Sequence, residues 1–585
     1  KDEFQLIHDF VTSKITTPVT SQNILVVDSL LAPKYPEAKH LHTDGLEGEI
    51  RVLQVESVNM YFVRNMGEDE LYINGFPFNN DRTYILNSGS SIRSQKVAPI
   101  YYSDILGKFL SDEHSEKIIF TVDNITYKFK AGNIGMHPLT FSEESGHMVG
   151  IMGASGAGKS TLLNILNGSY TPTTGKVSIN GINIHQDKDE IEGVIGYVSQ
   201  DDLLIEELTV YQNLFYNAKL CFGQLDDKQI HKKVIGVLQS IGLYDARDLK
   251  VGSPLEKTIS GGQRKRLNIA LELIREPSVL FVDEPTSGLS SRDSENIMDL
   301  LKELALKGKL VFVVIHQPSS DIFKMFDNLL ILDTGGYPIY IGNPVDAVIY
   351  FKRAVNHVNS DEAECPRCGN VNPEQIFNII EAKVVDEYGN LTKTRKFKPE
   401  DWYKRYKELI EPKLKILDDR EPLPKNSFNI PNKIKQFKVF ITRDVLSKLA
   451  NKQYMFINML EAPVLAFILS YIIRYYNTDV SNTIGYIYRE NENIPAYIFM
   501  AVIVALFIGL TVSAEEIIRD RKILKREKFL NLSKGSYLFS KIAIMLVLSA
   551  IQTFTFILIG NFVLDIKGMY SSYWLVLFST SFFAN

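Results

Sequence analysis

The stretch MVGIMGASGAGKSTLLNILNG, residues 148–168, joins an apolar run, a glycine-rich loop and a helix-forming segment in direct succession. This order predicts a buried strand that leads through the loop into a helix, which is the setting of a phosphate-binding loop. In such a loop the backbone N–H groups surround phosphates, the Lys159 ammonium reaches the β- and γ-phosphates, and the Ser160 hydroxyl ligates Mg²⁺. The predicted phosphate-binding residues are Gly153, Ser155, Gly156, Gly158, Lys159, Ser160 and Thr161.

A second apolar run, in SVLFVDEPTSGLSSRD, is followed directly by two carboxylates, Asp283 and Glu284. A buried strand that ends in carboxylates is the expected metal side of a nucleotide site. We expect Asp283 to hold Mg²⁺, directly or through water, and Glu284 to polarise the attacking water as general base. A further strand is predicted over LVFVVIH, but its terminal His316, taken alone, is more typical of a structural residue than of a catalytic one.

The stretch ISGGQRKRLNIALEL, residues 259–273, places a glycine pair at the start of a predicted helix, followed by three basic residues. Exposed N–H groups at a helix start favour a phosphate, whereas the basic residues Arg264, Lys265 and Arg266 also suit nucleic acid. The chain of 585 residues has a formal net charge of -5, so it lacks the overall positive charge that nucleic-acid binding requires. The phosphate is therefore the favoured ligand, and no nucleic-acid partner is expected.

Three long apolar runs, residues 456–473, 494–512 and 538–563, are each about long enough to cross a bilayer as a helix. A fourth run, from Ser572, stops at Asn585 and is too short to span, so we expect a helix that continues in a longer chain. The basic loop 519–534 is predicted to be cytoplasmic, and the N-terminal domains with it. This pattern predicts a multi-pass integral membrane protein, located in the plasma (inner) membrane if the chain is bacterial.

The remaining segments differ in amino-acid composition and in the pattern of their apolar residues. Residues 1–115 alternate short β-favouring runs with turn residues, which predicts a small all-β sandwich. Residues 351–430 read as a linker with one or two helices, and within it Cys365 and Cys368 have the spacing of half a zinc site or of a plain thiol pair. The expected fold is multidomain: the sandwich, an α/β nucleotide-binding domain over 116–350, the linker, and a partial all-α transmembrane domain over 431–585. In the last, residues 432–456 alternate apolar and basic positions, which fits a helix along the inner membrane surface.

The glycine loop, Gln200 after GVIGYVSQ, the SGGQ stretch, FVDE and His316 occur in the order of the ATP-binding cassette, and residues 118–345 resemble that family. The resemblance implies that the nucleotide is ATP. It also implies that Gln200 is a Mg²⁺ ligand that couples the site to the membrane domain, and that His316 contacts the γ-phosphate. The signature turn that closes over the ATP of the opposite subunit would be Ser260, Gly261, Gly262 and Gln263.

The stretches SGGQRKRLNIALELIREPSVLFVDEPTSGL and HQPSSDIFKMFDNLLILDTGGYPIYIGNP resemble the G subfamily of ATP-binding cassette transporters, in which the cassette precedes six spans. This implies a half-transporter that hydrolyses ATP to move an unidentified cargo, by export, as a homodimer or with a similar half-transporter. Ser290 stands where the family usually has Asp, which puts in doubt how tightly two ATP sites would be coupled. For adenine stacking the candidates are Phe129 and Tyr127, although both also fit a core strand.

The stretch ELYINGFPFNNDRTYILNSGSSIR, residues 70–93, is similar to the later half of a forkhead-associated domain. That similarity implies a phosphoprotein partner, but an inert docking module fits the same residues. Two alternatives to transport stay open from the sequence. One is a membrane-anchored signalling or regulatory module gated by ATP, and the other, disfavoured by the spans and the acidic balance, is a nucleic-acid ATPase.

Overall fold

The computed structural model describes residues 2–12, 23–55, 60–73, 76–86, 90–94, 97, 100–110, 117–253, 258–356, 371–385, 388, 391–414, 416–417, 422–423, 428–474, 486, 488–514, 516–527, 530 and 532–585. Lys1–Gln200 and Glu276–Asn426 form one structural unit, and Asp201–Arg275 with Ser427–Asn585 form the other. Cys365 and Cys368 lie outside the described residues.

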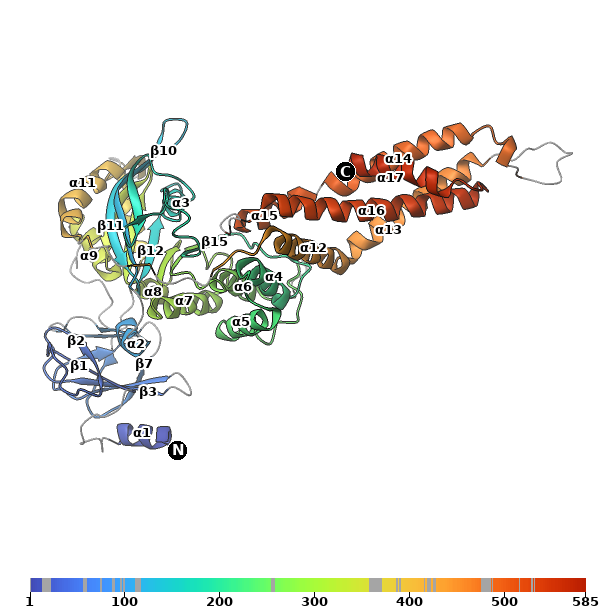
Figure 1. Cartoon of the computed structure of the whole chain (residues 1–585). Helices are drawn as coiled ribbons and strands as arrows, with labels where there is room; N and C mark the ends of the chain where they lie inside the picture. Colours follow the sequence, from blue (N-terminus) through green and yellow to red (C-terminus); the bar gives the residue numbers. More distant parts are fainter. Residues whose placement is uncertain are drawn as a thin grey trace. The chain divides into compact units, whose positions relative to one another are not determined.

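The first unit begins with a β-rich domain of two sheets, as the sequence predicts, with a helix at each end of it (Figure 1). The N-terminal helix α1 (Asp2–Val11) covers the outer face of the first sheet, where Phe10 packs with Ile24 and Val26. This explains why β1 is buried on both faces. The sheets are β2-β1-β3-β4-β7 (Lys39–His42, Ile24–Asp28, Ile50–Val55, Met60–Asn65, Tyr84–Leu86) and β6-β5-β8-β9 (Phe76–Pro77, Tyr72–Ile73, Ser91–Arg93, Ile100–Tyr101).

The helix α2 (Tyr102–Leu110) closes this domain and packs on the cassette helix α7 (Ser291–Leu306). Leu306, the last residue of α7, is buried in the same apolar cluster as Ile105 and Phe109 of α2. The β-rich domain and the cassette therefore share part of a core.

The cassette is built on a six-stranded sheet in the order β15-β16-β17-β12-β18-β19, in which only β19 is antiparallel to its neighbour. The strand bounds are Ile195–Val198, Val279–Asp283, Leu310–Val314, Met148–Gly153, Asn328–Asp333 and Tyr337–Gly342. A smaller antiparallel sheet, β11-β10-β13-β14 (Ile134–Glu144, Ile119–Lys128, Thr174–Ile179, Ile182–Asn183), covers it. Phe120 of β10 contacts Phe281 and Phe312 of the main sheet, so aromatic rings join the two layers. The helices of this region are α3 (Lys159–Leu166), α8 (Ser320–Lys324) and α9 (Pro344–Ala354).

The expected linker is in part a folded extension of the cassette. The helix α11 (Pro399–Leu409) lies against β19, and its Trp402 and Tyr406 are fully buried. Before it come α10 (Glu374–Ile380) and a hairpin of β20 (Lys383–Val385) and β21 (Leu391–Arg395). The helix α11 ends at Leu409, before Pro412, and a short 3₁₀ turn (Glu411–Lys413) follows.

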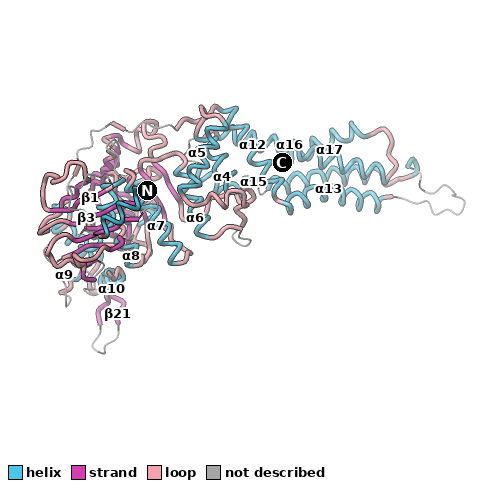
Figure 2. Tube along the Cα trace, turned by 90° about the horizontal axis from the view of Figure 1, so that it is seen from below, coloured by secondary structure: helices cyan, strands magenta, loops and turns pink. Residues whose placement is uncertain are grey.

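The second unit joins three cassette helices, α4 (Val210–Cys221), α5 (Asp227–Ser240) and α6 (Gly261–Leu273), to the helices of the membrane domain. The predicted spans are helices α13 (Lys452–Ile473), α14 (Ile494–Ala514) and α16 (Lys534–Val563), all long and apolar enough to cross a membrane. With α17 (Tyr570–Ala584) they lie side by side as a bundle (Figures 1 and 2). Small residues allow these helices to pack closely. A Cβ added at Gly509 of α14 would lie 2.4 Å from the backbone oxygen of Ser581 in α17, so only glycine fits at this contact.

Two details of the membrane domain differ from the sequence prediction. The single helix expected over 432–456 is broken at Asn451, which ends α12 (Lys433–Ala450) and caps α13 by accepting a hydrogen bond from the Tyr454 N–H. The basic loop after the second span is for the most part a helix, α15 (Glu516–Glu527). Three acids of this helix form ion pairs with neighbouring helices: Glu516 with Lys448 and Glu527 with Arg443 of α12, and Asp520 with Lys541 of α16.

Candidate functional site

The four strand ends that carry the predicted catalytic residues are neighbours in the main sheet. Gln200 follows β15, Asp283 and Glu284 end β16, His316 follows β17, and the glycine loop follows β12. Because these four strands are parallel, their carboxyl ends meet at one edge of the sheet. The topology thus brings four of the five sequence motifs, all except the signature turn, to one place.

The glycine loop has the shape that phosphate binding requires. Gly156 and Gly158 have φ of 78° and 92°, a left-handed backbone that glycine adopts without strain. Gly158 is the N-cap of α3, so free N–H groups at this helix start face the loop. A side chain at Gly153 has no room, because a Cβ there would lie 2.5 Å from the Leu332 oxygen.

Lys159 is buried beneath this loop and donates hydrogen bonds from Nζ to the carbonyl oxygens of Gly153, at 2.8 Å, and Ala154, at 3.1 Å. Burial lowers the pKa of its ammonium, while the charges of Glu284 and Asp283 act in the opposite direction. The neighbouring Ser155, Gly156 and Ser160 are exposed. A phosphate that enters the loop thus meets exposed donors and a lysine whose positive charge it would stabilise.

The predicted base Glu284 has a direct partner in the structure. Gln200 Nε2 donates a hydrogen bond of 2.8 Å to Glu284 Oε2. Glu284 and Gln317, the residue after His316, both have a left-handed backbone, with φ of 45° and 46°. For residues other than glycine this conformation is costly and is concentrated at functional sites.

The oxygen donors at this edge suit a hard divalent cation. Ser160 offers a hydroxyl, Gln200 an amide oxygen and Asp283 a carboxylate, which are ligand types that Mg²⁺ prefers when it also binds phosphates. Among the described residues no cluster of three or more His, Cys, Asp or Glu side chains could hold a metal by itself.

The two adenine candidates occupy different positions. Tyr127 lies in β10, stacks on the ring of Tyr170 at 5.6 Å between centroids and packs against the core. Phe129 is 42% exposed, with its ring set edge-on to Tyr127. Of the two predicted rings, only that of Phe129 presents a largely open face. Tyr170 was not predicted from the sequence, because it stands between the helix and the next strand without a motif.

The signature turn belongs to the second unit and starts helix α6. Ser260 is the N-cap: its hydroxyl accepts from the Gln263 N–H, and the Gln263 side chain accepts from the Ser260 N–H. The three basic residues behind the glycines all have protein partners. Arg264 and Lys265 pair with Asp202, and Arg266 donates to the Ile241 oxygen. These three basic side chains therefore form contacts within the protein, and they no longer support nucleic acid as a ligand.

Ser290 also has a structural role. It is the N-cap of α7, and its hydroxyl accepts a hydrogen bond of 3.2 Å from the Asp293 N–H. Aspartate would cap the helix equally well. Capping of α7 therefore does not distinguish Ser290 from the aspartate that the family usually has at this position.

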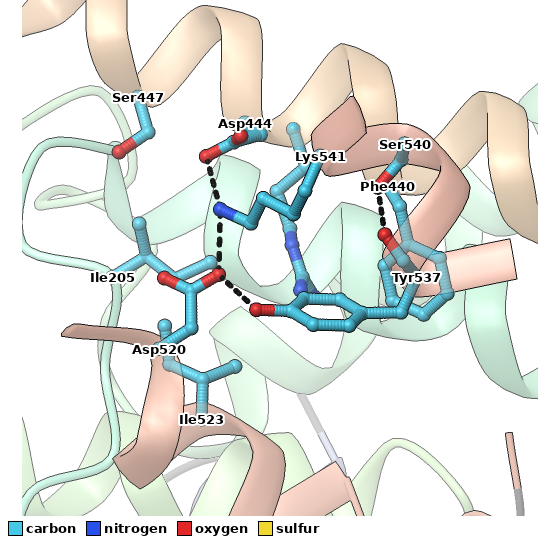
Figure 3. A pocket seen from close by; sticks show the side chains of 10 residues that line it. Ile205, Phe440, Asp444, Ser447, Asp520, Ile523, Tyr537, Ser540 and Lys541 are labelled. Carbon is cyan, nitrogen blue, oxygen red and sulfur yellow. Dashed lines mark hydrogen bonds and ion pairs between the residues drawn. The ribbon is translucent and has the colours of Figure 1, made fainter. Parts of the chain in front are cut away.

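An ionic cluster, which the sequence analysis missed, joins the helices at the cytoplasmic end of the membrane domain. Lys541 of α16 points between Asp444 of α12 and Asp520 of α15, at 3.0 Å and 2.7 Å (Figure 3). Tyr537 donates to Asp520, and Lys541 also reaches Glu516 at 3.3 Å. The side chains enclose a cavity of about 20 Å³, enough for about one water molecule.

Family models match two parts of the chain: an ABC transporter model matches residues 136–287, and an ABC-2 type transporter model matches residues 435–585. Among curated proteins, the ABC-type transporter claG of Penicillium crustosum is 40% identical over 36% of this chain and 28% of its own length. ABC transporter G family member STR2 of Petunia hybrida is 36% identical over 43% of this chain and 33% of its own length. ATP-binding cassette sub-family G member 5 of Mus musculus is 29% identical over 59% of this chain and 54% of its own length. The chain thus spans about half or less of these relatives.

Proposed function

Since the chain belongs to the ATP-binding cassette transporters of the G type, we propose that it is a half-transporter that hydrolyses ATP to drive transport across the membrane, by export. Two copies, or this chain and a similar half-transporter, would bind ATP between their cassettes. The observation that carries the proposal is the meeting of Lys159, Asp283, Glu284, Gln200 and His316 at one sheet edge, in a chain whose other unit has three membrane-spanning helices.

Each of the residues at this sheet edge has its own role in the proposed hydrolysis of ATP. The N–H groups of the glycine loop and Lys159 hold the β- and γ-phosphates, and His316 contacts the γ-phosphate. Glu284 accepts a proton from the attacking water and orients it in line with the bond to be broken. Ser160, Gln200 and Asp283 would hold Mg²⁺, which supplies charge neutralisation at the phosphates. The Gln200 amide can serve both residues at once, because its oxygen would bind the ion while Nε2 keeps its hydrogen bond to Glu284.

The signature turn completes the site from the other subunit. Ser260 and Gln263 cap the start of α6 through each other, and the Gly261 and Gly262 N–H groups between them form a helix start of the kind that attracts phosphate oxygen. Closure of two cassettes over two ATP molecules, followed by hydrolysis, would switch the membrane domain between inward and outward access.

We assign four domains to the chain: a β-sandwich over 1–115, the ATP-binding cassette over 116–350, its extension and linker over 351–430, and part of the transmembrane domain over 431–585. The first is proposed to dock a partner, and a phosphoprotein is the class that its forkhead-associated-like stretch suggests.

Replacing Glu284 by Gln tests the proposed base. The amide keeps the size of the side chain but cannot accept the proton, so hydrolysis is expected to fall on the order of 10²- to 10⁴-fold, with ATP retained on the protein. Glu303→Gln is the matched control, because this half-exposed carboxylate on α7 pairs with Lys307 on the same side of the helix. ATP turnover and nucleotide retained after washing are measured; normal turnover in Glu284→Gln would overturn the assignment.

One observation favours a second function, a membrane-anchored signalling module gated by ATP. Leu306 connects the β-rich domain to α7, the helix that begins just after the catalytic loop. Through this contact, a partner bound to the β-rich domain would respond to whether the cassette holds ATP, and no cargo would need to be transported. ATP-dependent accumulation of cargo in vesicles that carry the full-length protein distinguishes the two functions.

A further inference from the structure

Asp202 lies two residues after Gln200 and connects two parts of the second unit. Its Oδ2 accepts a hydrogen bond of 3.1 Å from Arg264 Nε, and its Oδ1 accepts one of 2.8 Å from Asn268 Nδ2. Lys265 Nζ lies 3.5 Å from the same carboxylate. Arg264 and Asn268 are one helical turn apart on α6, so a single carboxylate holds one face of the helix at two levels.

The helix side of this contact is deeply buried. The Arg264 side chain is 4% exposed and donates further hydrogen bonds to the carbonyl oxygens of Val251 and Gly252. Glu206 is the other acid near it, at 3.9 Å. A buried guanidinium with this many contacts is held in one position, and Asp202 is the acid that contacts both Arg264 and Asn268 of α6.

The backbone next to Asp202 is held from two sides. The Leu203 N–H donates to Asn268 Oδ1 at 3.2 Å, on the α6 side. The Leu203 oxygen accepts from Arg526 of α15, a buried side chain that also pairs with Glu527, which in turn binds Arg443 of α12. Leu203 therefore lies between the helix that carries the signature turn and the helices that lead into the membrane, bonded to the first through its N–H and to the second through its carbonyl oxygen.

We infer that Asp202 is a positioning residue that sets the signature turn 260–262 through Arg264 and Asn268, and that α15 holds the adjacent residue Leu203. The inference rests on the proposed function, in which that turn meets the ATP of the other subunit. The carboxylate does not touch ATP. It places the first turn of α6 so that its N–H groups reach the partner's γ-phosphate when the cassettes close.

The test compares Asp202→Asn, Asp202→Glu and Asp248→Asn in the full-length protein. Asp248 has an exposed carboxylate in the same subdomain, next to Arg247, and is the matched control for loss of one charge. Asp202→Asn should leave the affinity for ATP unchanged, since Lys159 and its loop are intact. It should lower kcat on the order of tenfold to hundredfold, the usual effect of a small misplacement, and speed amide hydrogen exchange in residues 260–266.

Asp202→Glu keeps the charge and should regain most of the lost kcat, while Asp248→Asn should behave as wild type. Unchanged exchange at 260–266 in Asp202→Asn, or an unchanged kcat, would overturn the inference. So would a fall in ATP affinity and melting temperature that Asp202→Glu fails to restore, because that pattern indicates a role in folding alone. If the wild-type protein hydrolyses no ATP, the proposed function fails, whereas hydrogen exchange still decides the role of Asp202.

Discussion

The ring of Phe129 and the charge of Lys159 have different roles in the proposed ATP site. Lys159 is buried beneath the glycine loop, and burial lowers the pKa of its ammonium, so that a phosphate bound there and the lysine would stabilise each other. Adenine binding would need no charge but an accessible aromatic ring, and Phe129, 42% exposed and next to the stacked pair of Tyr127 and Tyr170, is the ring proposed for it.

Replacing Phe129 by Ala tests this division. Stacking on one aromatic ring contributes on the order of 1 kcal/mol, so ATP should bind about fivefold more weakly, while the melting temperature of the protein stays the same. Tyr127→Ala removes a ring that packs against the core and should lower the melting temperature. Equilibrium binding of ATP to both variants is the measurement, and equal affinity of Phe129→Ala and wild type would exclude Phe129 as the adenine platform.

His147 gives the cassette a pH-dependent contact at the turn before β12. Its Nδ1 lies 3.2 Å from Oε2 of the buried Glu143. Burial alone would lower the pKa of His147, but the hydrogen bond and charge of Glu143 raise it overall. A raised pKa means that the protonated form is favoured in the folded protein, so this stabilisation is complete below the unfolded pKa of about 6.5 and is lost as pH rises through the folded value. The melting temperature of wild type should therefore exceed that of His147→Gln at low pH and approach it above that window; a constant difference would contradict the prediction.

At the scale of elements, some features follow from the sequence and others do not. The spans α13, α14 and α16 were predicted because a long apolar run has few other uses, and the strand ends of the cassette were predicted because each motif follows an apolar run. The break at Asn451 was missed, since an N-cap asparagine inside a helical pattern is a weak signal. The burial of Trp402 and Tyr406 was missed because a polar, lysine-rich segment can still place two aromatic rings on one helical face.

The ionic cluster of Lys541, Asp444, Asp520 and Glu516 belongs to this scale, because no single stretch of sequence contains it. Lys541 is the one cation that contacts all three acids among the ion pairs of the described residues. Removing it with Lys541→Met leaves buried carboxylates facing one another, which costs on the order of 3–5 kcal/mol. We expect a lower melting temperature and a loss of monodisperse protein in detergent. Lys541→Arg keeps the charge and should keep most of the stability. Lys534→Met changes an exposed lysine on the same helix and should have no effect. If Lys541→Met is as stable as wild type, the cluster does not hold these helices together.

At the scale of the whole molecule, the proposed dimer makes each ATP site depend on two chains. A two-fold symmetric pair places the Lys159 loop of one copy against the signature turn of the other, twice. Lys159→Ala disables the first part of a site. Gly261→Asp disables the second, because a carboxylate at the start of α6 suits the helix but repels phosphate.

The two changes give opposite results depending on how they are shared between chains. A dimer of one Lys159→Ala chain and one Gly261→Asp chain has one site with both defects and one intact site, so in a Glu284→Gln background it should trap about one ATP per dimer. A dimer of one chain with both changes and one chain with neither has a single defect in each site and should trap almost none. Dimers of each kind, isolated with two affinity tags, are compared by nucleotide stoichiometry. If the chain instead used its own signature turn, the second dimer would keep an intact site and the first would keep none, so the order of the two results decides between sites shared across the dimer and sites within one chain.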